Sequence, residues 1–164
     1  MWSPVEKTAL AEAEVEYHDK ESFTIWVKFK VSNAADDLND AHVVIWTTTP
    51  WTIPSNKAVV YGQDIAYGLY EVTGTPEESW TAVGDKFLLA DNLAADVMKR
   101  ARLEENQWTR VRGVPADELA DLTLSHPLAG AEGSNGEWDE ARDFRAAEFV
   151  TNTEGTGFVH CAPS

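Results

Sequence analysis

One stretch decides the fold: Trp46-Thr47-Thr48-Thr49-Pro50-Trp51-Thr52-Ile53-Pro54-Ser55-Asn56. It follows the β-branched residues 42–45, which predict a buried strand. The threonines favour continuation of that strand, and each proline then removes a backbone donor and holds the preceding residue in extended geometry. We therefore expect a rigid, extended loop at the end of a central strand, crowded with hydroxyls, an indole and a carboxamide.

The residues of this loop allow two interpretations. Short polar side chains on a stiff backbone suit a site that holds a small ligand without moving. A strand end rich in threonine and proline is also an ordinary structural feature. The loop by itself does not decide between a ligand site and a structural element.

Three motifs add a resemblance to a known family. Residues 47–56 resemble the threonine-rich peptide in the editing domain of isoleucyl-tRNA synthetases, which are class I aminoacyl-tRNA synthetases. The related valyl and leucyl enzymes carry an arginine before the proline and an acidic residue after it, so Thr49 and Trp51 indicate the isoleucyl branch. Residues 155–163, Gly-Thr-Gly-Phe-Val-His-Cys-Ala-Pro, resemble the other half of the same pocket. Residues 8–17 resemble the segment that leads into the domain.

The resemblance implies two groups of site residues. Those implied to act in hydrolysis, by lining the pocket at the ester and the aminoacyl side chain, are Thr47, Thr48, Thr49 and His160. Those implied to bind substrate are Trp51, Thr52, Asn56, Gly157 and Phe158. In this scheme His160 caps the side-chain pocket, Trp51 shapes its wall, and Asn56 holds the loop or the terminal adenosine. The residues alone leave open that His160, which shares a strand face with Phe158, is a core histidine.

The chemistry open to these residues is hydrolysis by a positioned water. His160 and Cys161 are adjacent, so on a strand they point to opposite faces and cannot form a dyad. The four histidines are scattered without a metal-ligand spacing, and there is no Cys-x-x-Cys pair. An aminoacyl ester is already activated, so orientation and hydrogen bonds to the oxyanion can suffice. We expect no metal or cofactor in this domain; ATP and magnesium are expected only for the synthetic domain of the parent enzyme.

The resemblance implies an editing hydrolase that removes valine from mischarged Val-tRNA(Ile), with valyl-adenylate as a further candidate substrate. The expected partners are the 3′ end of tRNA(Ile), one of these small substrates, and the rest of the synthetase in cis. Two other classes stay open: a non-catalytic module that grips the tRNA acceptor end, and a structural insertion with a vestigial pocket. In the family, an aspartate beyond the second motif captures the substrate amino group. This chain reaches Ser164 first, so we expect residues 1–164 to be a single excised editing domain, weak or inactive alone.

Composition limits the partners. A length of 164 residues fits one domain, and a formal net charge of −15 disfavours direct affinity for nucleic acid. We therefore expect most of a tRNA to be held by other parts of a larger protein. The single cysteine excludes an internal disulfide, and we find no signal peptide or membrane span in the sequence, so we expect a cytoplasmic protein.

Many short strands and few helices predict an α+β fold centred on a β-barrel, with one or two peripheral helices. The expected strands are residues 12–17, 23–31, 42–49, 57–61, 65–72, 79–83, 108–114, 145–151 and 157–161. Residues 12–17 and 23–31 are expected to form a hairpin, and 145–151 and 157–161 a closing antiparallel pair. Helices are expected at residues 86–103, capped by Asp85, and from Pro115. The basic end of the first helix (Lys99, Arg100, Arg102) suits either the helix dipole or RNA. Residues 130–143 are expected to be an exposed insertion.

Overall fold

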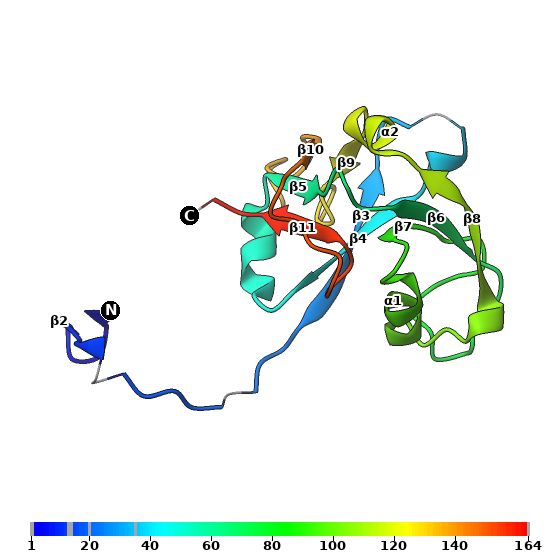
Figure 1. Cartoon of the computed structure of the whole chain (residues 1–164). Coiled ribbons are helices and arrows are strands. Elements are labelled where there is room, and N and C mark those ends of the chain that lie inside the picture. The colour runs from blue at the N-terminus through cyan, green and yellow to red at the C-terminus, as the bar shows by residue number, and fades with distance from the viewer. Residues whose placement is uncertain (1, 13–14, 20, 35, 164) are drawn as a thin grey trace.

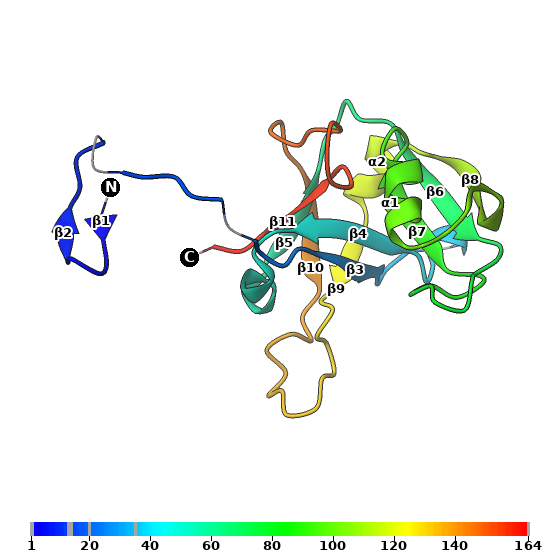
Figure 2. The same cartoon turned by 90° about the horizontal axis from the view of Figure 1, so that it is seen from below.

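The computed structural model describes residues 2–12, 15–19, 21–34 and 36–163. Its main feature is a mixed nine-stranded sheet in the order β11-β5-β10-β9-β3-β4-β7-β6-β8 (Figures 1 and 2). The strands of the sheet are β3 (Ile25–Val31), β4 (His42–Thr47), β5 (Ala58–Tyr61), β6 (Tyr67–Val72), β7 (Lys86–Ala90), β8 (Trp108–Val114), β9 (Thr123–Ser125), β10 (Arg142–Ala146) and β11 (Phe158–Cys161).

The helices are short. They are α1 (Ala94–Arg100), α2 (Ala116–Ala120) and the 3-10 helices η2 (Asp36–Leu38), η3 (Pro50–Ser55) and η4 (Glu105–Gln107). Strands β1 (Trp2–Ser3) and β2 (Thr8–Ala9) pair with each other and lie apart from the main sheet (Figure 1). None of the helices that the structure describes has the length and apolar character needed to cross a membrane.

Two hydrophobic clusters lie on the two faces of the central strands. The period-two pattern predicted for β3 is confirmed: Phe29 and Val31 are buried in the larger cluster, and Trp26 packs against the other one. Leu119 of α2 belongs to the larger cluster, whereas Val97 of α1 belongs to the second. The α+β class is therefore confirmed. No ladder among the described strands joins β11 to β8, so the β-barrel at the centre of the predicted fold is not closed and the strands form an open mixed sheet.

The long helix predicted for residues 86–103 is wrong in its first part. Residues Lys86–Ala90 form β7, which pairs in parallel with β4 and antiparallel with β6. A strand with neighbours on both edges and buried faces is apolar throughout, and such a run has no periodicity that separates it from a buried helix. The Asp85 carboxylate accepts from the Ala82 N–H at 3.1 Å and lies 3.6 Å from Lys28 Nζ, so it does not cap α1.

Other strand predictions fail for lack of partners. Residues 79–83 are irregular, with a bend at Trp80 and a turn that begins at Val83. The described part of residues 12–17 is not a strand, so no hairpin joins it to β3; residues 13–14 lie outside the described part. Strands β10 and β11 do not pair with each other, because β5 lies between them, parallel to β10 and antiparallel to β11. The short strand β9 was not predicted; three residues give too little pattern.

The insertion predicted at residues 130–143 is only partly exposed. Figure 2 shows the segment between β9 and β10 projecting from the sheet. Arg142, however, is buried within β10, and Trp138 packs back against His126. The segment is therefore a loop that leaves the sheet and returns to it.

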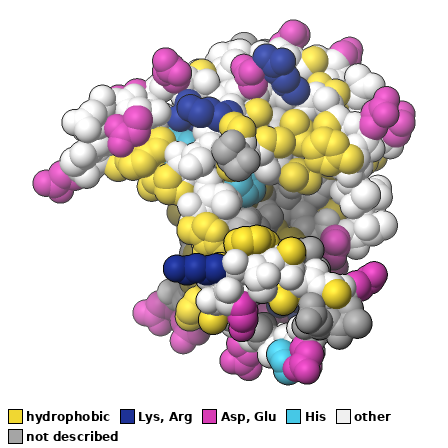
Figure 3. Space-filling view, turned by 90° about the vertical axis from the view of Figure 1, so that its left-hand side faces the viewer, with side chains coloured by type: hydrophobic (Ala, Val, Ile, Leu, Met, Phe, Trp, Pro, Cys, Tyr) yellow, Lys and Arg dark blue, Asp and Glu magenta, His cyan; other side chains and the backbone are white. Residues whose placement is uncertain are grey.

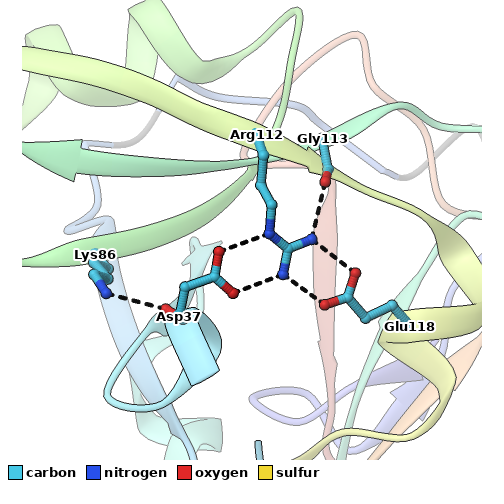
Figure 4. Close-up of polar contacts among 5 residues, drawn as sticks. All are labelled: Asp37, Lys86, Arg112, Gly113 and Glu118. Carbon is cyan, nitrogen blue, oxygen red and sulfur yellow. Dashed lines mark hydrogen bonds and ion pairs between the residues drawn. The ribbon is translucent and has the colours of Figure 1, made fainter. Parts of the chain in front are cut away.

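An ion-pair cluster connects strand β8, at one edge of the sheet, with η2 and α2 (Figure 4). The Arg112 guanidinium of β8 binds both carboxylate oxygens of Asp37 in η2, at 2.7 and 2.8 Å. It also binds both oxygens of Glu118 in α2, at 2.8 and 2.6 Å. Hydrogen bonds from Arg112 hold the pKa of Asp37 below its ordinary value. One arginine thus joins three elements that are distant in sequence.

Candidate functional site

The threonine stretch turns where the sequence predicted an extended loop. Strand β4 ends at Thr47, and the 3-10 helix η3 begins at Pro50. The Thr52 N–H donates to Thr49 O at 3.0 Å, and the Asn56 N–H donates to Ile53 O at 2.9 Å. Proline suits the first helical position because its fixed φ is already helical and its missing N–H is not needed there. The two prolines therefore shape a tight turn.

A chain of hydroxyls runs along this turn to the second motif. The Thr49 N–H donates to Thr47 Oγ1 at 3.1 Å, and Thr49 Oγ1 lies 3.4 Å from Thr52 Oγ1. The Thr52 hydroxyl donates to Thr49 O at 2.7 Å and lies 3.3 Å from His160 Nε2. Because the single hydroxyl proton of Thr52 is used toward Thr49 O, the proton shared with His160 sits on Nε2. The chain thus joins β4, η3 and β11.

Two groups at this site are left free. The Thr48 side chain is exposed at the strand end, and its hydroxyl has no hydrogen-bond partner among the described residues. His160 Nδ1 is buried and likewise unpartnered within the described part of the chain. Burial lowers the pKa of His160, so the ring is neutral at pH 7. The site therefore offers an open hydroxyl and a neutral imidazole.

Gly157 and Phe158 pack against Ala90 of β7 and Tyr67 of β6. The backbone of Gly157 has φ +81°, and a Cβ there would lie 2.4 Å from the Ala90 Cβ. Its carbonyl accepts from the Tyr67 hydroxyl at 2.7 Å. Phe158 is 3% exposed and stacks on Tyr67, with ring centroids 4.7 Å apart. The Phe158 ring is therefore part of the core, and its predicted contact with substrate stays a prediction.

Asn56 is buried, whereas Trp51 is exposed to solvent. Asn56 is 1% exposed, and its amide donates to Ala58 O at 2.8 Å and Cys161 O at 3.4 Å. These two bonds hold the loop, which is one of the two roles predicted for Asn56; its contact with an adenosine stays a prediction. Trp51 is 70% exposed on η3. Hydrophobic side chains gather on the face of the molecule seen in Figure 3, which is the side where η3 and the end of β11 lie in Figure 1.

Two residues missed by the sequence reasoning hold η3 in place. His126 Nε2 donates to Ile53 O at 2.9 Å, and Trp138 Nε1 donates to Pro54 O at 3.0 Å. Burial lowers the pKa of His126. The only sequence signals were a histidine before a proline and one tryptophan inside a Gly- and Ser-rich segment. Neither signal indicates which carbonyl the side chain reaches.

The described residues contain no group of three His, Cys, Asp or Glu side chains placed to hold a metal ion. The expectation that this domain needs no cofactor stays a prediction. Trp46 and Gly155 line a groove of about 720 Å³, and these two residues directly precede Thr47 and Thr156 in the chain.

Comparisons with known proteins show what this chain is similar to. No family model matches the sequence. The isoleucine–tRNA ligase of Ruegeria pomeroyi is 74% identical over 164 residues, which are 100% of this chain and 17% of that protein. That of Bradyrhizobium diazoefficiens is 50% identical over 164 residues, with 99% of this chain and 16% of that protein covered. This chain is related to the isoleucine–tRNA ligases along its whole length. It spans about one sixth of the length of these relatives.

Solved structures agree on the fold. GlLeuRS-CP1 superposes with a TM-score of 0.58 and 13% identity, covering 84% of this chain and 52% of that one. The editing domain of the P. falciparum cytosolic leucyl-tRNA synthetase gives a TM-score of 0.54 and 10% identity, covering 74% of this chain and 42% of that one. The fold is therefore that of synthetase editing domains, and the predicted resemblance to the isoleucyl branch is confirmed by the ligase relatives.

Proposed function

We propose that this chain is an editing module of an isoleucyl-tRNA synthetase, which hydrolyses Val-tRNA(Ile) and also accepts valyl-adenylate. The observation that carries the proposal is the hydroxyl chain from Thr47 to His160, with the Thr48 hydroxyl left free at its entrance. The ligase relatives and the editing-domain fold support the same assignment. The side chains of Thr47, Thr49 and Thr52 from the threonine motif and of His160 from the second motif thus lie together at the end of β4.

The geometry favours hydrolysis by positioned water. His160 and Cys161 are successive residues of β11, and burial raises the pKa of the Cys161 thiol, so the nucleophilic thiolate is disfavoured. The ester carbon is already electrophilic. Hydroxyl donors at the strand end can orient water and stabilise the oxyanion without a protein nucleophile. In this mechanism the neutral His160 ring serves as the wall of the pocket for the aminoacyl side chain.

The partners follow from the same proposal. The substrate end is the 3′ terminus of tRNA(Ile), and the rest of the synthetase acts in cis in the cytoplasm. A net charge of −15 means that this module contributes little to the overall affinity for tRNA. The remainder of the parent enzyme must therefore supply most of the phosphate contacts.

Thr48→Ala in an intact synthetase that carries this segment tests the proposal. Loss of one pocket hydrogen bond, worth about 1–3 kcal/mol, should slow valine release from Val-tRNA(Ile) while isoleucine activation stays unchanged. Thr109→Ala, at an exposed position of β8, is the matched control. Unchanged deacylation by Thr48→Ala would remove Thr48 from the site. Binding of the tRNA end by the unaltered enzyme without valine release at this domain would favour the alternative, a non-catalytic module that grips the acceptor end.

A further inference from the structure

A hollow of about 130 Å³ lies between helix α1 and strands β3, β4 and β7. The side chains at its base are buried members of the second hydrophobic cluster: Val44, Phe87, Val97 and Met98. Its sides include the indoles of Trp26 and Trp80. An apolar cavity of about 150 Å³ holds a benzene molecule. This hollow is therefore close to the size of one aromatic ring.

The loop that carries Trp80 is fixed against the end of α1. The Ser79 hydroxyl donates to Ala101 O at 2.9 Å. Arg102 binds the Glu78 carboxylate at 3.2 Å, and its guanidinium lies over the Trp80 ring, 5.6 Å from the centroid. Trp80 nevertheless stays 69% exposed. The structure therefore holds an uncovered indole at the side of an apolar hollow.

The charged side chains that line the hollow are Lys28 and Arg100, and both are positive. The protein as a whole has 28 acidic residues against 13 lysines and arginines, so a lining with cations and no acid goes against its overall charge. Lys28 Nζ lies 3.6 Å from the Asp85 carboxylate. Arg100 forms no ion pair among the described residues, and its guanidinium lies over the Trp26 ring, 5.9 Å from the centroid. One positive charge at the hollow is therefore free to bind an anion.

The helix dipole does not explain the hollow. A basic residue at position 100 complements the C-terminal end of α1, and a guanidinium is attracted to the face of an indole. Both effects leave the neighbouring space unexplained, because protein interiors are close-packed and contain few voids larger than a water molecule. Side chains that face such a gap lose dispersion contacts. A ligand that fills the hollow restores those contacts.

We propose that this hollow binds a small carboxylate with an aromatic or branched aliphatic body. The body lies between Trp26, Trp80 and Phe87, and the carboxylate meets Arg100. A carboxylate suits this position because the planar guanidinium fork matches it with two parallel hydrogen bonds. The two cations disfavour an ammonium group. An inorganic anion lacks the apolar body that fills the hollow.

The test titrates the 164-residue chain with para-fluorophenylacetate and follows the ligand by fluorine NMR. The acid should bind with a Kd of about 1 mM, which is ordinary for a ligand of this size. The amide, para-fluorophenylacetamide, keeps the ring and loses the charge, so its Kd should be about three to five times higher. The amine, para-fluorophenethylamine, should bind more weakly still. The indole N–H signals of Trp26 and Trp80 should shift with the acid.

Two pairs of variants locate the ligand. Arg100→Gln should raise the Kd of the acid about three- to fivefold and leave that of the amide unchanged. Lys99→Gln is the matched control, because it removes the same charge one residue away on α1 from a side chain that does not line the hollow. Trp80→Ala should weaken binding of the acid and the amide alike, whereas Trp2→Ala, 64% exposed on β1, should change neither. All four side chains are exposed, so the variants should fold.

Four results would overturn the proposal. They are no saturable binding of the acid, equal Kd values for the acid, the amide and the amine, equal weakening of acid and amide by Arg100→Gln, and equal weakening by Trp80→Ala and Trp2→Ala. A Kd that rises with protein concentration would also overturn it, because a second copy of the chain would then occupy the hollow. The three ligands decide the proposal on the unaltered chain even where a variant does not fold. The described residues that line the hollow lie outside residues 46–56 and 155–163, so valine release by an intact synthetase tests the proposed function separately.

Discussion

His126 and Trp138 stack on each other, with ring centroids 5.9 Å apart and planes inclined by 11°. Each ring donates its N–H to one of two consecutive carbonyls of η3, those of Ile53 and Pro54. The Leu128 N–H donates to His126 Nδ1 at 3.1 Å, which places the ring proton on Nε2. The loop between β9 and β10 therefore holds the turn that follows the threonines.

Trp138→Phe should destabilise the protein through this contact. Phenylalanine keeps the stacked ring but loses the N–H that binds Pro54 O, and one such bond is worth about 0.5–1.5 kcal/mol. Urea denaturation of the full chain measures the loss. Trp51→Phe is the matched control, because Trp51 is 70% exposed and its indole has no hydrogen bond among the described residues. Equal free energies of unfolding for the two variants would contradict the holding role of Trp138.

Acidification should weaken the same contact. Burial places the folded-state pKa of His126 below the ordinary value of 6.5. The unfolded chain then takes up a proton near pH 6.5 while the folded chain does not. The stabilisation is therefore fully present above that pH and is lost as the pH falls through the folded pKa. Protonation also removes the acceptor of the Leu128 N–H.

The measurement is the free energy of unfolding at pH 7.5 and pH 5.5, for the unaltered chain and for His126→Gln. His42 and His160, whose pKa values are also lowered by burial, are present in both proteins. Their contribution cancels in the difference. The unaltered chain should lose more stability on acidification than the variant does. The same loss in both proteins would show that His126 does not carry the pH dependence.

Periodicity predicted those elements whose burial alternates or whose ends are marked. Strand β8 was predicted over its observed range, and α2 starts after Pro115 as expected. The failure at β7 has the opposite cause, since its residues 87–90 are buried on both faces and show no alternation. The partners of β5 could not be predicted, because pairing between distant strands leaves no local trace in the sequence.

The candidate site was predicted from its motifs, and the structure shows which of those residues lie close together. The predicted meeting of the threonines with His160 is seen in the hydroxyl chain. Phe158 carries the same motif signal but serves the core. His126 and Trp138 escaped prediction because their roles depend on contacts to backbone carbonyls 73 and 84 residues away.

Gly157→Ala should lower the free energy of unfolding by more than the strain of a positive φ alone explains. An L-residue at φ +81° is strained by about 1–2 kcal/mol. The added Cβ would also meet the Ala90 Cβ at 2.4 Å, an atom that cannot rotate away, and overpacking adds about 1–3 kcal/mol. Gly133→Ala is the control, with φ +84° and nothing within 4 Å of the added Cβ. Equal destabilisation in urea would mean that β11 and β7 move apart without cost.

The last prediction concerns selection at His160. Valine and isoleucine differ by one methylene, so a hydrolytic pocket must accept valine and exclude the larger side chain by steric clash. Excluding a methylene from a rigid site is worth about 1–3 kcal/mol. His160 suits this role because it stands on a strand paired with β5, and Thr52 holds its ring through Nε2.

His160→Ala in an intact synthetase should therefore keep releasing valine from Val-tRNA(Ile) and begin to release isoleucine from Ile-tRNA(Ile). Val159→Ala, on the other face of the same strand and 39% exposed, should leave the selectivity unchanged. If His160 were a general base, both deacylation rates would be abolished in the variant. If it were only a core residue, both rates would fall together with the melting temperature. Measuring the two rates and the melting temperature separates these outcomes, and continued rejection of Ile-tRNA(Ile) by a folded His160→Ala enzyme would exclude His160 as the wall, because a shortened side chain leaves the methylene room to enter.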